Sequence, residues 1–262
     1  SAFGNARILE GIVSTAAEQS YSTTIRTLDD LQDRSLAGAL KLVEDLPLDG
    51  VIVIMERDFT DFNQFKPPQG LPIVLISEEP ANNCVTIDSD SYGCSTAAVD
   101  YMLSKGHRTV YHIAGPSMSR AAQSRIRGWH DALAQAGATI PPIYIGDWEA
   151  DSGYQAGLAL AHEEACTAVY AANDQMAYGA MLGLQAAGKR VPEDVSIIGV
   201  DDSLEGMVPR LDLTTLRLRF HDVGREAFSM IKRQRNGEKV TPGVKTVIPP
   251  EFIDRGSVRE LK

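Results

Sequence analysis

The segment from Ala171 to Asp202 constrains the fold more than any other part of the chain. It reads as the end of an apolar run, a polar turn, an amphipathic helix, a tight loop and a second apolar run. Asn173 and Asp174 suit a helix N-cap, and Gly188 suits the C-cap. The run 195–200 is apolar at almost every position, as in a strand buried on both faces. The segment therefore predicts neighbouring parallel strands with polar side chains at their carboxyl ends, where open α/β sheets bind small ligands.

The rest of the chain repeats this alternation of helix and strand, which predicts parallel sheets with helices on both faces. Helices are expected near residues 4–20, 33–46, 91–105, 119–137, 152–164, 174–187 and 220–235. Strands are expected near residues 23–28, 50–55, 72–76, 109–114, 142–145, 167–171, 195–200, 214–218 and 244–248.

The irregular segment 77–91 indicates two sheets rather than one, because a new helix–strand series begins after it. Short extended pieces near 216–220 and 246–250 suit further crossings between domains. We therefore expect an α/β protein with two doubly wound, parallel-sheet subdomains joined by crossover strands. The N-terminal subdomain is expected to contain residues 1–105 and 219–246, and the C-terminal subdomain residues 106–218 and 247–262.

The order of the elements has one irregularity at its start. The series begins with a helix, whereas a doubly wound sheet normally begins with a strand that becomes central. We therefore expect the first strand of the N-terminal subdomain to lie ahead of Ser1, outside this sequence. A natural protein without that strand is the less favoured explanation.

The composition is that of a globular protein with an acidic surface. Of the 262 residues, 44% are hydrophobic and 23% are charged, and the formal net charge is -10. Because an acidic surface repels phosphate backbones, this portion is not expected to bind nucleic acid by itself. No apolar run approaches the roughly 20 residues that cross a bilayer, and the first residues lack the regions of a secretory signal. We therefore expect a cytoplasmic protein without a membrane segment.

The three cysteines, Cys84, Cys94 and Cys166, are odd in number and form no CxxC pair. This pattern favours a reducing compartment and free, mostly buried thiols. A Cys84–Cys94 disulfide is the less favoured alternative.

Arg125 and Ser119 are candidate ligand contacts on the helix predicted over 119–137. Arg125 lies at the edge of the apolar helix face, where its fork of donors could hold two neighbouring hydroxyls. The alternative is a solvated helix arginine. Ser119 is read first as the N-cap of this helix, with a ligand contact as the alternative.

Trp148 and Phe220 are the aromatic candidates. Trp148 follows a predicted strand, where an indole can cover the apolar face of a sugar ring; the alternative is that it fills the loop against the core. Phe220 begins the helix after strand 214–218, and it either stacks on a ligand or packs where the chain crosses between subdomains. Asp88 and Asp90 flank the first crossing, and each is read as a surface turn residue.

Asn173 and Asp201 are the polar candidates at the predicted sheet edge. An amide beside a carboxylate suits a polyhydroxylated ligand, because each hydroxyl both donates and accepts. Helix or turn capping is the alternative for both. Because adjacent strands bring the two residues to one edge, the ligand interpretation is favoured for the pair.

Signals for catalysis are weak. The five histidines show no metal-ligand spacing such as HExxH, and the sequence has no GxGxxG, GxxxxGK[ST] or GxSxG motif. Asp201 and Asp202 are neighbours on one strand end, so their side chains point apart and make a poor acid/base pair. We expect no enzyme activity, no cofactor and no metal.

Six motifs in register resemble the effector-binding portion of a lac-repressor-family transcription regulator, and together they cover most of residues 100–225. They are SKGHRTVYHIAGP (104–116), RIRGW (125–129), GDWEADSGY (146–154), AANDQMAYGAM (171–181), VPEDVSIIGVDD (191–202) and LTTLRLRF (213–220). Leu218 departs from the family, which usually has glutamine there. The resemblance implies a fold like that of type I periplasmic binding proteins.

The resemblance also implies what each candidate does. The residues matching Arg125, Asn173 and Asp201 hydrogen-bond a sugar effector in the cleft between the subdomains, and those matching Trp148 and Phe220 contact its ring. Ser119 matches a hydroxyl contact in the same pocket. An acidic contact comes from the region 88–93, where Asp90 is the candidate.

A homodimeric sensor is implied as well, in which the effector controls operator DNA binding by a helix-turn-helix domain absent from this sequence. The main alternative is a solute-binding protein of a sugar transporter, which shares this fold. A second alternative, an enzyme on a doubly wound fold, rests on fold analogy alone.

Overall fold

The computed structural model describes residues 2–28 and 34–261. The chain folds as two compact α/β units, each with a sheet of its own. Unit 1 contains Ser1–Ser89 and Arg219–Ile248, and unit 2 contains Asp90–Leu218 and Pro249–Lys262. The chain therefore passes between the units three times.

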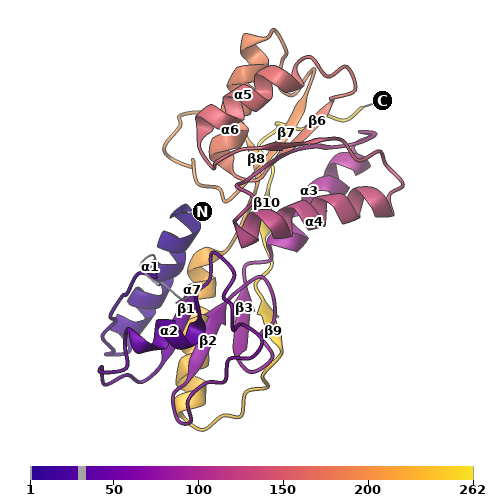
Figure 1. The fold of residues 1–262 in the computed structure, drawn as a ribbon. Helices are drawn as coiled ribbons and strands as arrows, with labels where there is room; N and C mark the ends of the chain where they lie inside the picture. Colours follow the sequence, from indigo (N-terminus) through magenta and orange to yellow (C-terminus); the bar gives the residue numbers. More distant parts are fainter. Residues whose placement is uncertain (1, 29–33, 262) are drawn as a thin grey trace. The chain divides into compact units, whose positions relative to one another are not determined.

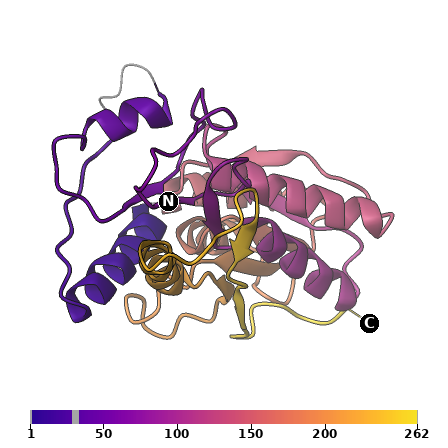
Figure 2. The same ribbon diagram turned by 90° about the horizontal axis from the view of Figure 1, so that it is seen from below.

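Unit 1 is built on a four-stranded parallel sheet of order β1-β2-β3-β9. Its strands are β1 (Val51–Ile54), β2 (Ile73–Ile76), β3 (Val85–Asp88) and β9 (Lys245–Val247), and its helices are α1 (Ala2–Glu18), α2 (Leu36–Lys41) and α7 (Phe220–Arg235). Glycines let α1 and α7 approach closely (Figure 2): a Cβ at Gly11 would lie 2.1 Å from the carbonyl oxygen of His221. On the α2 side, Leu36 and Phe65 join β1 and β2 in a buried apolar cluster.

Two expectations for unit 1 were wrong. The predicted strand 23–28 forms neither strand nor helix and belongs to no sheet, whereas β3 forms inside the segment that looked irregular. The predicted helix near 33–46 begins at residue 33, which lies outside the described residues, and α2 is its described part. Pairing with neighbouring strands, rather than local composition, determines whether each of these two segments forms a strand.

Unit 2 contains a six-stranded sheet of order β10-β8-β7-β6-β4-β5, parallel except for β10. The strands are β4 (Tyr111–Ala114), β5 (Ile143–Ile145), β6 (Ala168–Ala171), β7 (Ser196–Val200), β8 (Thr214–Arg217) and β10 (Glu251–Ile253). The helices are α3 (Ser91–Ser104), α4 (Arg120–Gln135), α5 (Ala150–Leu160) and α6 (Asp174–Ala186). Helices α5 and α6 cover one face of the sheet, and α3 and α4 cover the other (Figure 1). The doubly wound fold is therefore confirmed.

The first domain boundary lies at 89/90 rather than at the predicted 105/106, which changes the unit that contains α3. Helix α3 packs against α4, and the hydroxyls of Ser95 and Tyr170 are hydrogen-bonded at 2.7 Å. The 218/219 crossing lies where it was predicted, and the last one lies at 248/249 instead of 246/247. A helix that follows a crossing carries no local sign of which sheet it covers, which explains the error.

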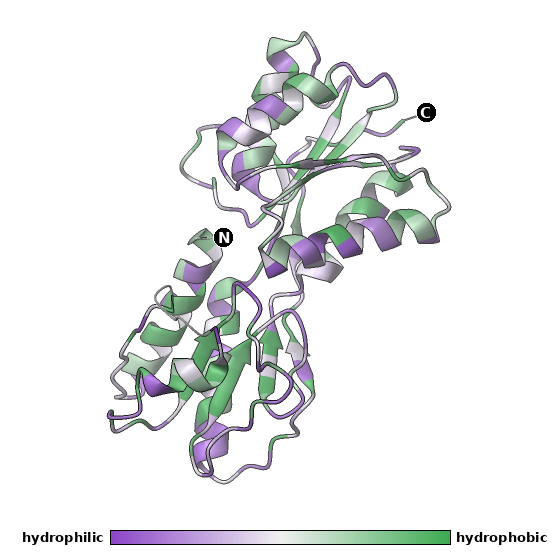
Figure 3. Cartoon of the chain, viewed as in Figure 1, coloured by the Kyte–Doolittle hydropathy of each residue, from purple (hydrophilic) through white to green (hydrophobic). Residues whose placement is uncertain are grey.

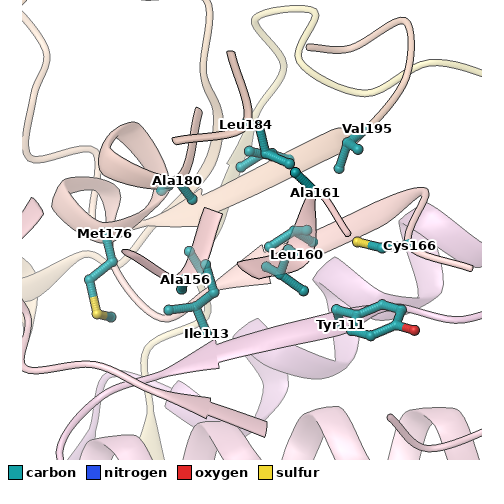
Figure 4. Packing of buried hydrophobic residues seen from close by; sticks show 14 of the residues in the cluster. Tyr111, Ile113, Ala156, Leu160, Ala161, Cys166, Met176, Ala180, Leu184 and Val195 are labelled. Carbon is teal, nitrogen blue, oxygen red and sulfur yellow. The ribbon is translucent and has the colours of Figure 1, made fainter. Parts of the chain in front are cut away.

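The core of unit 2 combines strand interiors with the inner faces of α5 and α6. Every residue of β6 and β7 is buried, and Ile113, Leu160 and Met176 pack into one cluster (Figure 4). In unit 1, the apolar strands stand out in green from helices of mixed hydropathy in Figure 3. None of the described helices is long and apolar enough to span a bilayer. All three cysteines are free and buried, as predicted.

Helices α5 and α6 pack against each other through glycines. A Cβ at Gly179 would lie 1.9 Å from the carbonyl oxygen of Ala150, and one at Gly153 would lie 2.1 Å from that of Met176. Because no side chain separates the backbones at these points, the two helices form one closely packed layer. This layer fixes the position of the first turn of α6, which begins at the sheet edge.

Candidate functional site

The carboxyl ends of four parallel strands meet at one edge of unit 2. Gly115 follows β4, Trp148 follows β5, Asn173 follows β6, and Asp201 follows β7. Arg125 reaches the same edge from α4, which packs on the sheet face that α3 also covers. The structure thus brings together four of the predicted site residues, namely Arg125, Trp148, Asn173 and Asp201.

Arg125 and Asp201 form a buried ion pair. Both residues are 2% exposed, and Nη2 of Arg125 lies 3.4 Å from Oδ1 of Asp201. Nη1 of Arg125 donates to the carbonyl oxygen of Ala172, the residue after β6. The solvated-helix alternative for Arg125 is therefore wrong. Both charges of this enclosed pair have lost their hydration. The pair is therefore stable only because the strand ends supply hydrogen-bond partners in a favourable geometry.

Trp148 lies over the guanidinium of Arg125. The Cζ atom of Arg125 is 5.6 Å from the centroid of the Trp148 ring, within cation–π distance. The indole rests on Gly115, where a Cβ would lie 2.3 Å from Cη2 of the ring. Gly115 is thus a part of the site that sequence reasoning missed, and its place directly after a predicted strand is the signal that was available.

Asn173 holds two neighbouring segments in register. Its Oδ1 accepts from the backbone N–H of Met176 at 3.0 Å, which caps α6, and its Nδ2 donates to the carbonyl oxygen of Trp148 at 2.8 Å. The helix-capping interpretation is confirmed. The same amide also ties the Trp148 loop to the end of β6, so Asn173 positions the indole.

The acidic pair after β7 divides between two environments. Asp201 is turned toward Arg125, whereas Asp202 accepts from Arg217 Nη2 at 2.6 Å and from Arg255 Nη1 at 2.7 Å. Although burial opposes it, hydrogen bonds from these two arginines lower the pKa of Asp202. Asp202 therefore stays ionised and ties the loop after β7 to β8 and to the segment that follows β10.

The backbone at this edge has an unusual conformation. Four non-glycine residues in or beside the site have positive φ: Asp90 (63°), Trp148 (79°), Asp201 (97°) and Asp202 (55°). Aspartate tolerates this region, but a bulky tryptophan rarely adopts it. Strain of this kind persists only where the surroundings hold it, and it concentrates at binding sites.

The remaining predicted residues have structural roles. Oγ of Ser119 accepts from Ala122 N at 3.3 Å and caps α4, and Oδ1 of Asp90 accepts from Gly93 N at 2.9 Å and caps α3. Phe220 belongs to unit 1, where its ring makes an edge contact with Phe3 at 6.3 Å. Ligand contacts by Ser119, Asp90 and Phe220 stay predictions.

Asp174 lies at this edge beside Asn173, as predicted, but it was not among the candidate ligand contacts. Its Oδ1 accepts from the Thr215 hydroxyl at 2.7 Å, and its Oδ2 accepts from Ser203 N at 2.9 Å. Burial raises the pKa of Asp174 to about 8, although these hydrogen bonds oppose the shift. A protonated Asp174 thus connects the start of α6 to β8 and to the loop after β7.

We expect the stability of unit 2 to fall as pH rises from about 6.5 to 8. The folded state keeps the Asp174 proton up to about pH 8, whereas the unfolded carboxyl loses it near pH 4; the resulting slope is at most about 1.4 kcal/mol per pH unit. Burial also lowers the pKa of His112 to about 4, which gives the opposite slope below pH 6.5. Urea unfolding of wild type and Asp174→Asn should therefore diverge between pH 6.5 and 8, and parallel curves would contradict the assignment.

Within residues 2–28 and 34–261, no three metal-ligating side chains lie together. The site instead offers a buried arginine, a buried carboxylate and an aromatic ring at one strand edge. This combination is chemically able to donate hydrogen bonds to a neutral polar molecule, to accept hydrogen bonds from it and to cover its apolar face.

Comparison with known proteins gives consistent matches. A family model described as a periplasmic binding protein-like domain matches residues 99–258. The HTH-type transcriptional repressor CytR of Escherichia coli (strain K12) is 30% identical over 259 residues, with coverage of 97% of this chain and 75% of that protein. The HTH-type transcriptional repressor PurR of Haemophilus influenzae (strain PittEE) is 28% identical over 262 residues, with coverage of 98% and 78%.

Solved structures agree with the fold. A complex of the transcriptional regulator CelR with cellobiose has a TM-score of 0.78 at 28% identity and covers 97% of this chain and 79% of that one. The Lac repressor dimer bound to operator and the anti-inducer ONPF has a TM-score of 0.79 at 24% identity, covering 98% and 90%. The second likeness shows the fold alone.

Proposed function

Because this chain belongs to the lac-repressor family of transcriptional regulators, we propose that it senses a small carbohydrate and thereby controls operator binding. The observation that carries the proposal is the buried Arg125–Asp201 pair beneath the Trp148 indole. The curated relatives are transcriptional repressors rather than enzymes, and we propose no reaction for this chain.

Each group has a part in the proposed recognition. The guanidinium of Arg125 donates to neighbouring hydroxyls, the carboxylate of Asp201 accepts from them, and the indole covers the apolar face of the ring. Both charges are already desolvated and oriented in the folded protein, so little ordering remains to be done on binding. The CelR–cellobiose complex supports a carbohydrate as the ligand class.

The regulatory step follows from the chain crossings. The polypeptide passes between the units three times, and we propose that ligand binding changes their relative orientation. In a homodimer this change would alter the spacing of two DNA-binding domains over operator half-sites. Since a repressor works where its operator lies, we place the protein in the cytoplasm.

A ligand screen tests this function. The melting temperature should rise with a mono- or disaccharide, because a ligand at 100 times its Kd adds about 2.7 kcal/mol of stability to the folded state. Matched nucleosides should leave the melting temperature unchanged. Calorimetry should then give 1:1 binding with the sugar recovered unchanged. A response to nucleosides alone, or conversion of the sugar, would reject the carbohydrate sensor.

Gly115→Ala is expected to weaken sugar binding roughly tenfold, about 1–2 kcal/mol, with little loss of stability. The added methyl would meet the far end of the Trp148 ring at 2.3 Å, so the indole must move while the backbone stays. Calorimetry measures the affinity, and tryptophan fluorescence reports the displacement, because Trp129 is buried elsewhere. Unchanged affinity would show that the Trp148 indole does not contact the ligand.

A further inference from the structure

Unit 1 contains a cavity that lies outside the proposed carbohydrate site. The cavity has a volume of about 690 Å³, within the range of roughly 300–1,000 Å³ that small-molecule sites occupy. Its first wall is α2 together with the chain that follows it as far as Leu48, and its second wall is the segment 61–71. Because both walls belong to unit 1, the cavity shares no residue with the strand edge of unit 2.

The lining of this cavity is mainly apolar. The apolar side chains come from both walls, and they are Leu40, Val43, Leu46, Leu48, Phe65 and Leu71. Phe65 is buried, whereas the other five are only half-buried. These five side chains keep apolar area in contact with water, so the hydrophobic effect favours an apolar molecule that fills the space between them.

Hydrogen bonds attach the second wall to the rest of unit 1. The carboxylate of Asp61 accepts from the backbone N–H groups of Leu36 at 2.7 Å and Ala37 at 3.0 Å, which ties this wall to the first turn of α2. Nδ2 of Asn83 donates to the carbonyl oxygen of Phe65 at 3.1 Å and holds the same wall from the β2–β3 connection. The cavity is therefore largely formed in the folded protein, which lowers the entropic cost of binding.

The rim of the cavity carries two lysines. Lys41 and Lys66 line the cavity with exposed side chains, and neither ammonium group has an ion pair or a hydrogen bond with any described residue. Two carboxylates share the rim. Asp61 is occupied by its two backbone donors, whereas Glu44 has no such partner among the described residues. The rim therefore offers two available cations against one available carboxylate.

We propose that this cavity binds a small amphipathic acid, namely a free monocarboxylate with an aliphatic or aromatic tail. The tail fills the space between the apolar side chains of the two walls. The carboxylate lies at the rim, where the ammonium groups of Lys41 and Lys66 donate to it. A sugar is a poor occupant, because its hydroxyls would face apolar side chains without hydrogen-bond partners. The proposal is independent of the carbohydrate site, since the two sites share neither residues nor ligand chemistry.

Ligand titration followed by NMR tests the proposal. Octanoate is the acid probe, and octan-1-ol is its neutral counterpart of equal chain length. Octanoate should shift the methyl signals of Leu40, Leu48 and Leu71 with a Kd on the order of 1 mM, and octan-1-ol should bind at least about three times more weakly. The proposal is overturned if octanoate leaves these three leucines unshifted at about ten times that concentration, or if the alcohol binds equally well.

Charge variants at the rim give the sign of the effect. Lys41→Gln combined with Lys66→Gln should weaken octanoate binding about three- to tenfold, because contacts to exposed cations are partly screened by water. Glu44→Gln removes a repelling carboxylate and should strengthen binding about twofold. Since these side chains are exposed, the variants should be as stable as wild type to within about 0.5 kcal/mol.

Lys239→Gln is the matched control. Lys239 is also an exposed lysine of unit 1, but it does not line the cavity, so its replacement should leave the affinity for octanoate unchanged. Equal affinities in wild type and the double lysine variant, or an equal loss in Lys239→Gln, would show that the rim does not hold the carboxylate. Shifts of the same leucines with protein concentration alone would assign the cavity to a second copy of the chain, which also overturns the proposal.

Discussion

Arg125→Ala is expected to abolish carbohydrate binding, by at least a hundredfold in Kd, and to destabilise unit 2 by roughly 3–5 kcal/mol. The binding loss follows because the variant lacks the fork of donors at the sheet edge. The stability loss follows because Asp201 is 2% exposed and its carboxylate would stay buried without the compensating cation. Calorimetry and urea unfolding measure the two effects.

A double variant separates binding from folding. Arg125→Met with Asp201→Asn removes both charges at nearly constant volume, and asparagine tolerates the positive φ of position 201. Stability should recover most of what Arg125→Ala loses, because a neutral buried pair carries no charge to compensate. Binding should stay lost. Wild-type affinity in the double variant would show that Arg125 and Asp201 do not bind the ligand.

Gly179→Ala is expected to destabilise unit 2 by about 3 kcal/mol or more, although alanine favours helices over glycine by about 1 kcal/mol. The new Cβ would lie 1.9 Å from the Ala150 carbonyl oxygen and 2.9 Å from Tyr154 N, and both are backbone atoms of α5. Helices α5 and α6 must therefore separate. Because Asn173, the N-cap of α6, holds the Trp148 loop, that loop should shift as well and weaken ligand binding.

Leu182→Ala on the same helix is the matched control. Leu182 is 41% exposed, so its loss should cost well below 1 kcal/mol and leave binding intact. Urea unfolding of the two variants gives the comparison. A Gly179→Ala protein as stable as Leu182→Ala would show that the two helices separate at little cost.

Local sequence predicted the strand edge well because its signals are local. The position of Asn173 just before a helical pattern predicts that it caps α6, and it does so in the structure. Strand β7 is buried, as its apolar composition indicates. The environment of Arg125 was not predictable in this way. Its position at the edge of a helix face is compatible with water or with burial, and its partner Asp201 lies 76 residues further along the chain.

Errors arose where pairing between distant segments decides the structure. Residues 23–28 have strand-forming side chains, yet a strand exists only when a neighbour satisfies its backbone. Conversely, β3 pairs with β2 and β9 although its surroundings are polar and irregular. The role of Gly115 was missed for the same reason, since only the folded loop brings the Trp148 ring onto it.

The positive-φ residues around the site have a consequence for attempts to make this protein withstand heat. Replacing Trp148 with glycine would release backbone strain of order 1 kcal/mol, but it would also lose the packing of the indole against the core of unit 2, which contributes more. The strained tryptophan therefore supports the stability of the loop as well as the proposed site. Variants selected for heat tolerance should keep Trp148 and gain stability at other positions.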